Sequence, residues 1–367
     1  MIYRHAIFYA FIMYSCGLQA GQSIVGAANE SYAIREDGSV AAWGWNISGA
    51  LEVPDELTNC IALSGSAGSA FCLALDGHGR IWGWGSTNYG RIDIPDDLTN
   101  AVDIAAGMNH SLAITRDGLV RGWGQNTHGQ ATPPSSLSNV IAIAASTYHS
   151  LALDAYGHVT AWGSNIGGPT NVPSNLSNVV DIAAGDEGSL ALRSDGSLIV
   201  WGNVPTPPVS TGVVAIATSY KHYLLLLQDG TVRAWGLNKE GQASVPASLS
   251  NVVAIAAGGF HSLALTRDGT LVCWGSDVVG QSSPPSNSWY IPFGVNEHIS
   301  DIQIDLSTDQ HVLMYLLDRG MSYRLMSSTD LEQWQADMPY LHGHGEVQYG
   351  QFHTNNIIRR FYRLQQY

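Results

Sequence analysis

Short apolar runs alternate with turn residues along most of the chain, and a Trp-Gly pair closes every third run. In the unit that begins at Asn251, apolar and small residues fill 252–256 and 262–265, and an Asp-Gly pair precedes a third run at 270–274. Short runs bounded by Gly, Asp and Pro predict strands. An Asp-Gly pair predicts a tight turn between two of them. Each unit is thus predicted to hold three strands and a fourth, proline-containing segment that suits a sheet edge.

The unit repeats seven times with a nearly constant period. Successive Trp-Gly pairs are 41, 39, 39, 39, 34 and 39 residues apart, at Trp43, Trp84, Trp123, Trp162, Trp201, Trp235 and Trp274. A fixed period near forty residues indicates one supersecondary unit that buries its apolar face only against its neighbours. We expect the seven tryptophans to be structural, because a buried Trp hides about 150–250 Å².

Two linked motifs recur in register. Ile-Ala-Ala-Gly-x-x-His-Ser-Leu-Ala-Leu precedes Asp-Gly-x-Val-x-x-Trp-Gly-x-Asn-x-x-Gly-Gln, and together they resemble the repeat of the regulator of chromosome condensation (RCC1) family. The resemblance covers residues 23–285 and implies a seven-bladed β-propeller of four-stranded blades. The Trp-Asp and Gly-Gly signatures of WD40 and kelch propellers are absent at the corresponding places.

Some units depart from this pattern. The fifth is shorter and lacks the Gly-Gln turn, which predicts a clipped outer loop. Four units hold His at one shared position, which we call the His slot, whereas the others hold Glu30, Phe71 or Gly188 there. Because a ring spreads these histidines over separate blades, we interpret them as structural, with ring nitrogens bonded to backbone groups. Cys60, Cys72 and Cys273 are expected to be buried free thiols.

Composition supports an all-β protein and argues against one class of partner. Forty Gly, fourteen Pro and only 13% charged residues fit many short strands joined by turns. The formal net charge of −14 disfavours nucleic acid, whose binding relies on Lys and Arg. No nucleotide-binding loop, metalloprotease or hydrolase motif is present. We therefore expect a non-enzymatic, monomeric protein without cofactors.

The N-terminus is predicted to direct export. Arg4 and His5 precede an apolar run at 6–14, and 18–20 offers a cleavage site, so residues 1–20 read as a signal peptide. Attachment of lipid at Cys16 is an alternative. No later apolar run is long enough to cross a bilayer. We therefore expect the protein outside the cell or in its envelope.

The periodicity fails beyond the ring, which we assign to residues 21–292. Strand-like runs at 301–306, 311–317, 323–327, 346–352 and 357–364 predict a small β-sandwich-like module over residues 298–367. These strands could instead close the ring. His342, His344 and His353 could bind a metal, but histidines incidental to turns are the simpler interpretation, and we assign no metal.

Comparison of the units with one another separates a repeating scaffold from variable loops. Because strand direction alternates within a blade, the loop before the His slot and the loop after Trp-Gly should lie on the same face. Aromatic residues in such loops contribute little to the core but much to an interface. The predicted partner-binding residues are Tyr89, Met108, Asn109, His128, Tyr148, Asp186, Glu187, Tyr220, Lys221, Lys239, Glu240 and Phe260.

The leading hypothesis is a protein-binding face. Bacterial propellers similar to this family include a secreted inhibitor of β-lactamases, so the resemblance implies protein recognition outside the cytoplasm. Carbohydrate binding on the same aromatic face is the main alternative. Guanine nucleotide exchange, the activity of the nuclear family members, and action on polysaccharides are lesser ones, since a fold alone does not confer function.

Overall fold

The computed structural model describes residues 23–35 and 37–285, and the backbone of six strands between residues 310 and 366. The predicted signal peptide lies outside the described residues. The chain divides into two compact units, Met1–Gly294 and Val295–Tyr367. Within the described residues, no helix has the length and hydropathy needed to cross a bilayer.

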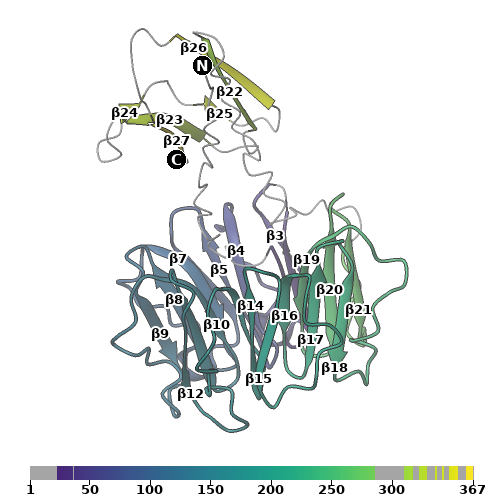
Figure 1. Ribbon diagram of the computed structural model, residues 1–367. Helices are drawn as coiled ribbons and strands as arrows, with labels where there is room; N and C mark the ends of the chain where they lie inside the picture. The colour runs from purple at the N-terminus through teal and green to yellow at the C-terminus, as the bar shows by residue number, and fades with distance from the viewer. Residues whose placement is uncertain are drawn as a thin grey trace. The chain divides into compact units, whose positions relative to one another are not determined.

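The first unit contains seven antiparallel sheets of three consecutive strands in its described part (Figure 1). The first strands are β1 (Ile24–Gly26), β4 (Cys60–Ser66), β7 (Ala101–Ala106), β10 (Val140–Ala145), β13 (Val179–Ala184), β16 (Val213–Thr218) and β19 (Val252–Ala257). The second strands are β2 (Glu30–Ile34), β5 (Ser69–Asp76), β8 (His110–Thr115), β11 (His149–Asp154), β14 (Gly188–Arg193), β17 (His222–Leu227) and β20 (His261–Thr266). The third strands are β3 (Val40–Gly44), β6 (Ile81–Gly85), β9 (Val120–Gly124), β12 (Val159–Gly163), β15 (Leu198–Gly202), β18 (Val232–Gly236) and β21 (Leu271–Gly275).

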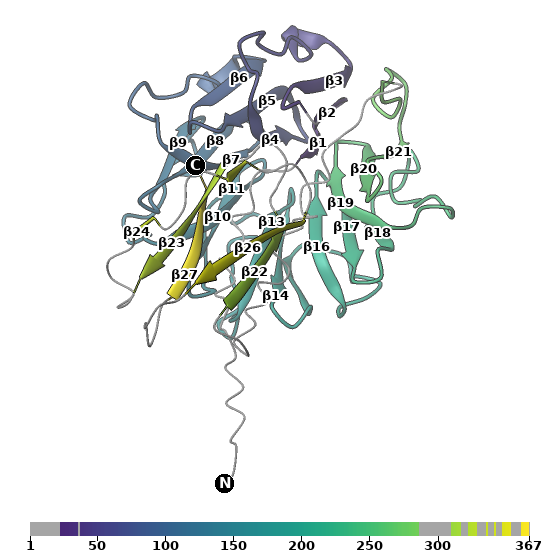
Figure 2. The same cartoon turned by 90° about the horizontal axis from the view of Figure 1, so that it is seen from above.

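The sheets follow one another around an axis (Figure 2). The first strand of each sheet contacts the first strand of the next, and β1 contacts β19, so the ring closes. Closure also involves the segment after β21, because the carbonyl of Gln281 accepts hydrogen bonds from the Ser31 hydroxyl (2.8 Å) and the Trp43 indole (3.0 Å). The chain thus forms seven blades whose last segment covers the first blade.

The expectation of four-stranded blades is corrected by the structure. The fourth segment of each unit, where Pro173 and Pro246 lie, pairs with no sheet among the described residues. Its carbonyls bond to side chains instead of to a neighbouring strand. Gln130, for example, accepts from the Trp162 indole at 2.8 Å and from the Ser150 hydroxyl at 2.9 Å. Side-chain donors therefore replace the backbone ladder at the outer edge.

The seven repeated tryptophans lie between neighbouring blades. All seven are buried, with 4–8% of their surface exposed, and each lies in an apolar cluster shared with a neighbouring blade. Trp162, for instance, packs with Leu112 and Ile114 of the preceding blade. Each indole thus joins two blades by apolar packing and by a hydrogen bond to the preceding fourth segment.

A belt of buried histidines and serines also joins the blades, and it corrects the expectation that histidine ring nitrogens bond to the backbone. In the described residues, four Nε2 atoms lie within hydrogen-bond distance of a serine hydroxyl of the next blade. These pairs are His110–Ser150 (2.9 Å), His149–Ser189 (3.0 Å), His222–Ser262 (3.0 Å) and His261–Ser31 (2.7 Å). Burial lowers the pKa of all four, to about 3 or 4, so the rings are neutral at pH 7.

The shortened fifth unit alters this belt in a coordinated way. A Cβ atom added to Gly188, in the His slot, would lie 2.1 Å from Cγ2 of Val204. Val204 belongs to the clipped loop, so this loop fills the space that a histidine side chain needs elsewhere. The next blade holds Tyr223 at the serine position, and its ring stacks on Trp235 with centroids 4.8 Å apart.

Gly188→Ala should therefore destabilise the ring although most units carry a side chain here. We expect a loss of about 1–3 kcal/mol, since the new methyl group overlaps Val204 in a packed site. Urea unfolding would measure it. In a protein that already carries Val204→Gly, the substitution Gly188→Ala should cost less, because the overlapping side chain is gone. No loss of stability from Gly188→Ala in the wild type would contradict this packing.

The cysteines largely match expectation. Cys60 and Cys72 are buried free thiols, whereas Cys273 is only partly buried. Burial raises the pKa of Cys60 to about 12 and that of Cys72 well above its ordinary value. Both thiols are therefore protonated and unreactive at neutral pH.

The second unit is described by its strands alone. They are β22 (Gln310–Leu316), β23 (Ser322–Ser328), β24 (Gln335–Ala336), β25 (Leu341–His342), β26 (Val347–His353) and β27 (Phe361–Gln366). β22 pairs with β26, and β23 pairs with β24, β25 and β27. The predicted strand at 301–306 and the side chains of the three candidate metal-binding histidines lie outside what is described.

Candidate binding face

Two sets of loops lie together at one end of every blade, as the alternation of strand direction predicts. In each blade, the first amide after Trp-Gly donates to the carbonyl of the residue directly before the His slot, where the loop between the first and second strands ends. Examples are Ser86 to Ala70 (2.8 Å), Ser164 to Tyr148 (2.9 Å) and Ser276 to Phe260 (2.9 Å). We call the surface formed by these loops the loop face; it comprises residues 28–29, 45–50, 67–70, 86–91, 108–109, 125–130, 147–148, 164–169, 186–187, 203–205, 220–221, 237–242, 259–260 and 276–281.

Four aromatic side chains predicted for this face are exposed. The exposed fractions are 61% for Tyr89, 41% for Tyr148, 39% for Tyr220 and 38% for Phe260. Two of them lie near each other, with the ring centroids of Tyr220 and Phe260 6.5 Å apart. The Tyr148 ring packs edge-on against His128, at 5.3 Å. The face therefore presents large rings that add little to the core.

The charged residues predicted for the face are partly paired with each other. Lys221 Nζ lies 3.2 Å from Glu187 Oε1, and Asn203 donates a hydrogen bond to the same carboxylate. These contacts lower the pKa of Glu187 and raise that of Lys221. Lys239 and Glu240 are exposed, and Asp186 is partly buried. Of the remaining predicted residues, Met108 is partly buried and Asn109 is buried, so Asn109 contributes its backbone rather than its side chain.

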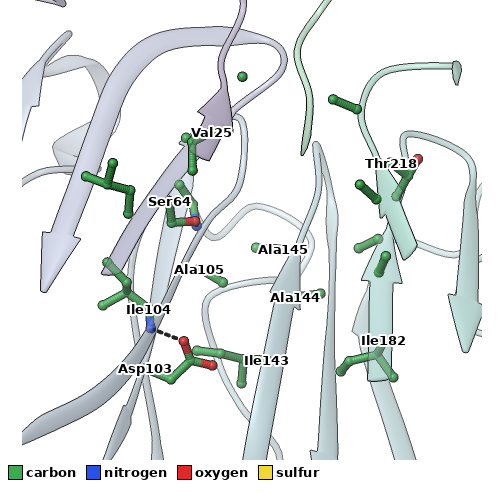
Figure 3. Close-up of a pocket in the computed structure, with 18 of the residues that line it drawn as sticks. Val25, Ser64, Asp103, Ile104, Ala105, Ile143, Ala144, Ala145, Ile182 and Thr218 are labelled. Atoms are coloured by element: carbon green, nitrogen blue, oxygen red, sulfur yellow. Dashed lines mark hydrogen bonds between the residues drawn. The ribbon is translucent and has the colours of Figure 1, made fainter. Parts of the chain in front are cut away.

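The first strands of all seven blades line a cavity of about 120 Å³ at the ring axis, and Figure 3 shows some of the lining side chains. Small residues of the first strands line most of it, among them Ala105, Ala144 and Ala145. Asp103 also lines it, and its carboxyl group accepts from the Ile104 amide (2.8 Å). Asp181, at the equivalent position of β13, is likewise buried and accepts from the Ile182 amide (2.7 Å). Burial raises the pKa of Asp181 to about 7 and that of Asp103 well above its ordinary value. Drug-sized ligands occupy roughly 300–1,000 Å³, so this cavity is too small for them.

Sequence reasoning missed two residues on this face. Trp45, directly after the first Trp-Gly pair, is 47% exposed. Arg91 is a buried cation at the position where three other units hold Gln130, Gln242 and Gln281. The departure of Arg91 from the repeated Gln was visible in the sequence, whereas its burial depends on packing between blades.

The fold and its loops define a β-propeller built from sequence repeats. The family description "Regulator of chromosome condensation (RCC1) repeat" matches residues 101–130, 179–203, 213–242 and 252–281. The matched stretches lie in the third, fifth, sixth and seventh repeats, which are similar to that repeat. No curated protein matches the chain.

Solved structures share this fold at low sequence identity. Prp20p from Saccharomyces cerevisiae is 20% identical, with a TM-score of 0.52, covering 71% of this chain and 80% of that one. A second structure, yeast RCC1 (Prp20) bound to Kap60, gives 19% identity and a TM-score of 0.56 over 82% of this chain and 88% of that one. The ectodomain of the receptor kinase ACR4 from Arabidopsis thaliana is 18% identical, with a TM-score of 0.60, covering 72% of this chain and 98% of that one.

Proposed function

We propose that the protein binds a protein partner through the loop face and is not an enzyme. The observation that carries this proposal is the cluster of exposed Tyr89, Tyr148, Tyr220 and Phe260 on loops that a rigid ring holds in place. Tyr and other aromatic residues are enriched in the centres of protein interfaces. The exposed aromatic residues of these variable loops are thus available to a partner.

Two further observations support an extended protein as the ligand. The axial cavity cannot hold a drug-sized molecule, which leaves the outer surface as the larger binding area. The buried histidines are neutral and bonded to serine hydroxyls on separate blades, so they do not converge on a reaction centre. In addition, Prp20p from Saccharomyces cerevisiae has binding properties to Gsp1p and histones, and yeast RCC1 (Prp20) has been solved bound to Kap60, so a propeller of this fold can bind proteins.

Affinity capture with four matched proteins would test the proposal. Extracellular and envelope fractions would be passed over the wild type, a variant with Ala at the four loop aromatics, and two single controls, Leu119→Ala and Tyr156→Ala. Leu119 and Tyr156 are exposed but lie in the turns between second and third strands, at the opposite end of the blades. We expect a protein retained by the wild type and both controls and lost by the fourfold variant. Retention by all four proteins, or by none, would contradict the proposal.

Export remains part of the proposal, on the sequence of residues 1–20 alone. N-terminal sequencing of the protein recovered from its producing cells would test it. A mature chain that begins near residue 21 supports export, and an intact N-terminus in the cytosolic fraction opposes it. A glycan array run with the wild type and the fourfold variant would separate carbohydrate binding from protein binding.

A further inference from the structure

Arg91 is a buried cation on the loop face that pairs with no carboxylate among the described residues. It is only 2% exposed. Its Nε donates to the Asn88 carbonyl at 2.7 Å and its Nη1 to the Met108 carbonyl at 2.9 Å. In this part of the chain, Nη2 makes no hydrogen bond, yet it is not among the fully enclosed polar atoms. One donor atom of the guanidinium thus lacks a partner among the described residues.

The scaffold does not need a positive charge at this position. Three sister units place Gln there, and Gln130, Gln242 and Gln281 each accept a hydrogen bond from an amide of their own loop, at 2.8–3.0 Å. In the second blade, the Asn88 carbonyl accepts a hydrogen bond from Nε of Arg91 instead. Desolvating a cation is costly, and burial lowers the pKa of Arg91. A neutral Gln would hold the same turn without that cost, which points to a role for the charge outside the scaffold.

Two aromatic rings, one buried and one exposed, lie beside the Arg91 guanidinium. The guanidinium lies 5.3 Å from the Phe71 ring centroid and 5.8 Å from that of Tyr89, within cation–π range. Phe71 occupies the His slot of this blade, so the guanidinium lies beside the ring where four other blades have histidine. Tyr89 has a φ of +61°, a conformation unfavourable for a bulky side chain. That conformation holds the most exposed of the four loop aromatics beside an unpaired cation.

We infer that Arg91 is the anchor for an acidic side chain, Asp or Glu, of the protein partner, with Tyr89 packing beside it. This inference rests on the proposed protein-binding function. A carboxylate accepting from Nη2 satisfies the open donor and supplies the missing counter-charge. Hydrogen bonds between guanidinium and carboxylate groups are among the stronger ones in proteins. Arg is also over-represented among the residues that dominate binding energy.

A displayed library of random linear peptides, without free carboxyl termini, would supply the probe. Peptides selected on the wild type that fail to bind the fourfold loop variant should be enriched in Asp and Glu. One such peptide would then be synthesised together with its Asp→Asn or Glu→Gln analogue. Affinities of both peptides would be measured for the wild type and for Arg91→Gln.

Removing either charge should weaken binding roughly ten- to hundredfold, the range for a hydrogen bond to a charged group. Removing both should cost little more than removing one, because the two groups interact with each other. Arg91→Gln should keep the melting temperature of the wild type, since Gln is native to this position in three sister units.

The results separate this inference from the proposed function. If Arg91→Gln binds the peptide as the wild type does while the fourfold variant does not, the loop face recognises proteins but Arg91 is not the anchor. Equal enrichment of neutral peptides, or no peptide that depends on the loop face, would also overturn the inference. If the losses of affinity from Arg91→Gln and from the neutral peptide add up, the acidic residue of the peptide contacts a group other than Arg91.

Discussion

Trp162→Gly should cost the ring about 3–5 kcal/mol of unfolding free energy, the range for removing a large aromatic side chain from a core. Trp162 is 8% exposed and packs between two blades. Its indole also donates to the Gln130 carbonyl, which the substitution leaves with the Ser150 hydroxyl as its remaining side-chain donor. Guanidinium or urea denaturation followed by circular dichroism would measure the loss.

Trp45→Gly is the matched control, because it removes the same side chain from a site that is 47% exposed. We expect this control to change stability by less than about 1 kcal/mol. Equal destabilisation by the two substitutions would mean that the repeated tryptophans do not hold the blades together.

The stability of His110→Phe relative to the wild type should increase as the pH falls. Burial lowers the pKa of His110 from 6.5 to about 3. Below pH 6.5 this histidine is protonated in the unfolded chain but stays neutral in the folded ring. Its contribution to the stability of the wild type is therefore fully present at higher pH and decreases as the pH falls toward 3. The variant lacks the group and its titration. Phe is the residue that the second blade holds in the same slot, at Phe71.

The stability difference between wild type and His110→Phe should therefore shift by about 2 kcal/mol in favour of the variant between pH 7 and pH 5. The difference is the quantity to measure, because Glu30 and Asp181 act in the opposite direction. Burial raises the pKa of each to about 7, so their contributions are lost as the pH rises from about 4 to 7. These groups are present in both proteins and cancel in the comparison. A difference independent of pH would contradict a buried, neutral His110.

The strands of the ring could be predicted because each is coded locally. Asp-Gly turns, short apolar runs and the Trp-Gly pairs mark the three strands of each unit, and Ala101–Ala106 or His110–Thr115 follow that pattern. The fourth segment was wrongly expected to be a strand. Its carbonyls, such as that of Gln130, are taken by an indole and a hydroxyl of the next blade. Such partners lie 20 or more residues away and leave no local signal.

The features of the candidate site were likewise predictable only where their cause is local in the sequence. The sharing of one face by both loop sets follows from strand direction alone, and loop hydrogen bonds such as Ser164 to Tyr148 bear it out. The exposure of each side chain depends instead on packing between blades. Asn109 was expected on the surface but is buried, and the buried Arg91 was not singled out. The histidine partners were missed because serine hydroxyls and ring nitrogens meet only across the interface between two blades.

Hydrogen–deuterium exchange on the complex with the captured partner would test most directly whether the loop face is the binding surface. We predict that binding slows exchange in the loops around Tyr89, Tyr148, Tyr220 and Phe260 and leaves the turns around Leu119 and Tyr156 unchanged. Protection confined to those turns, or to residues 295–367, would contradict a loop-face interface.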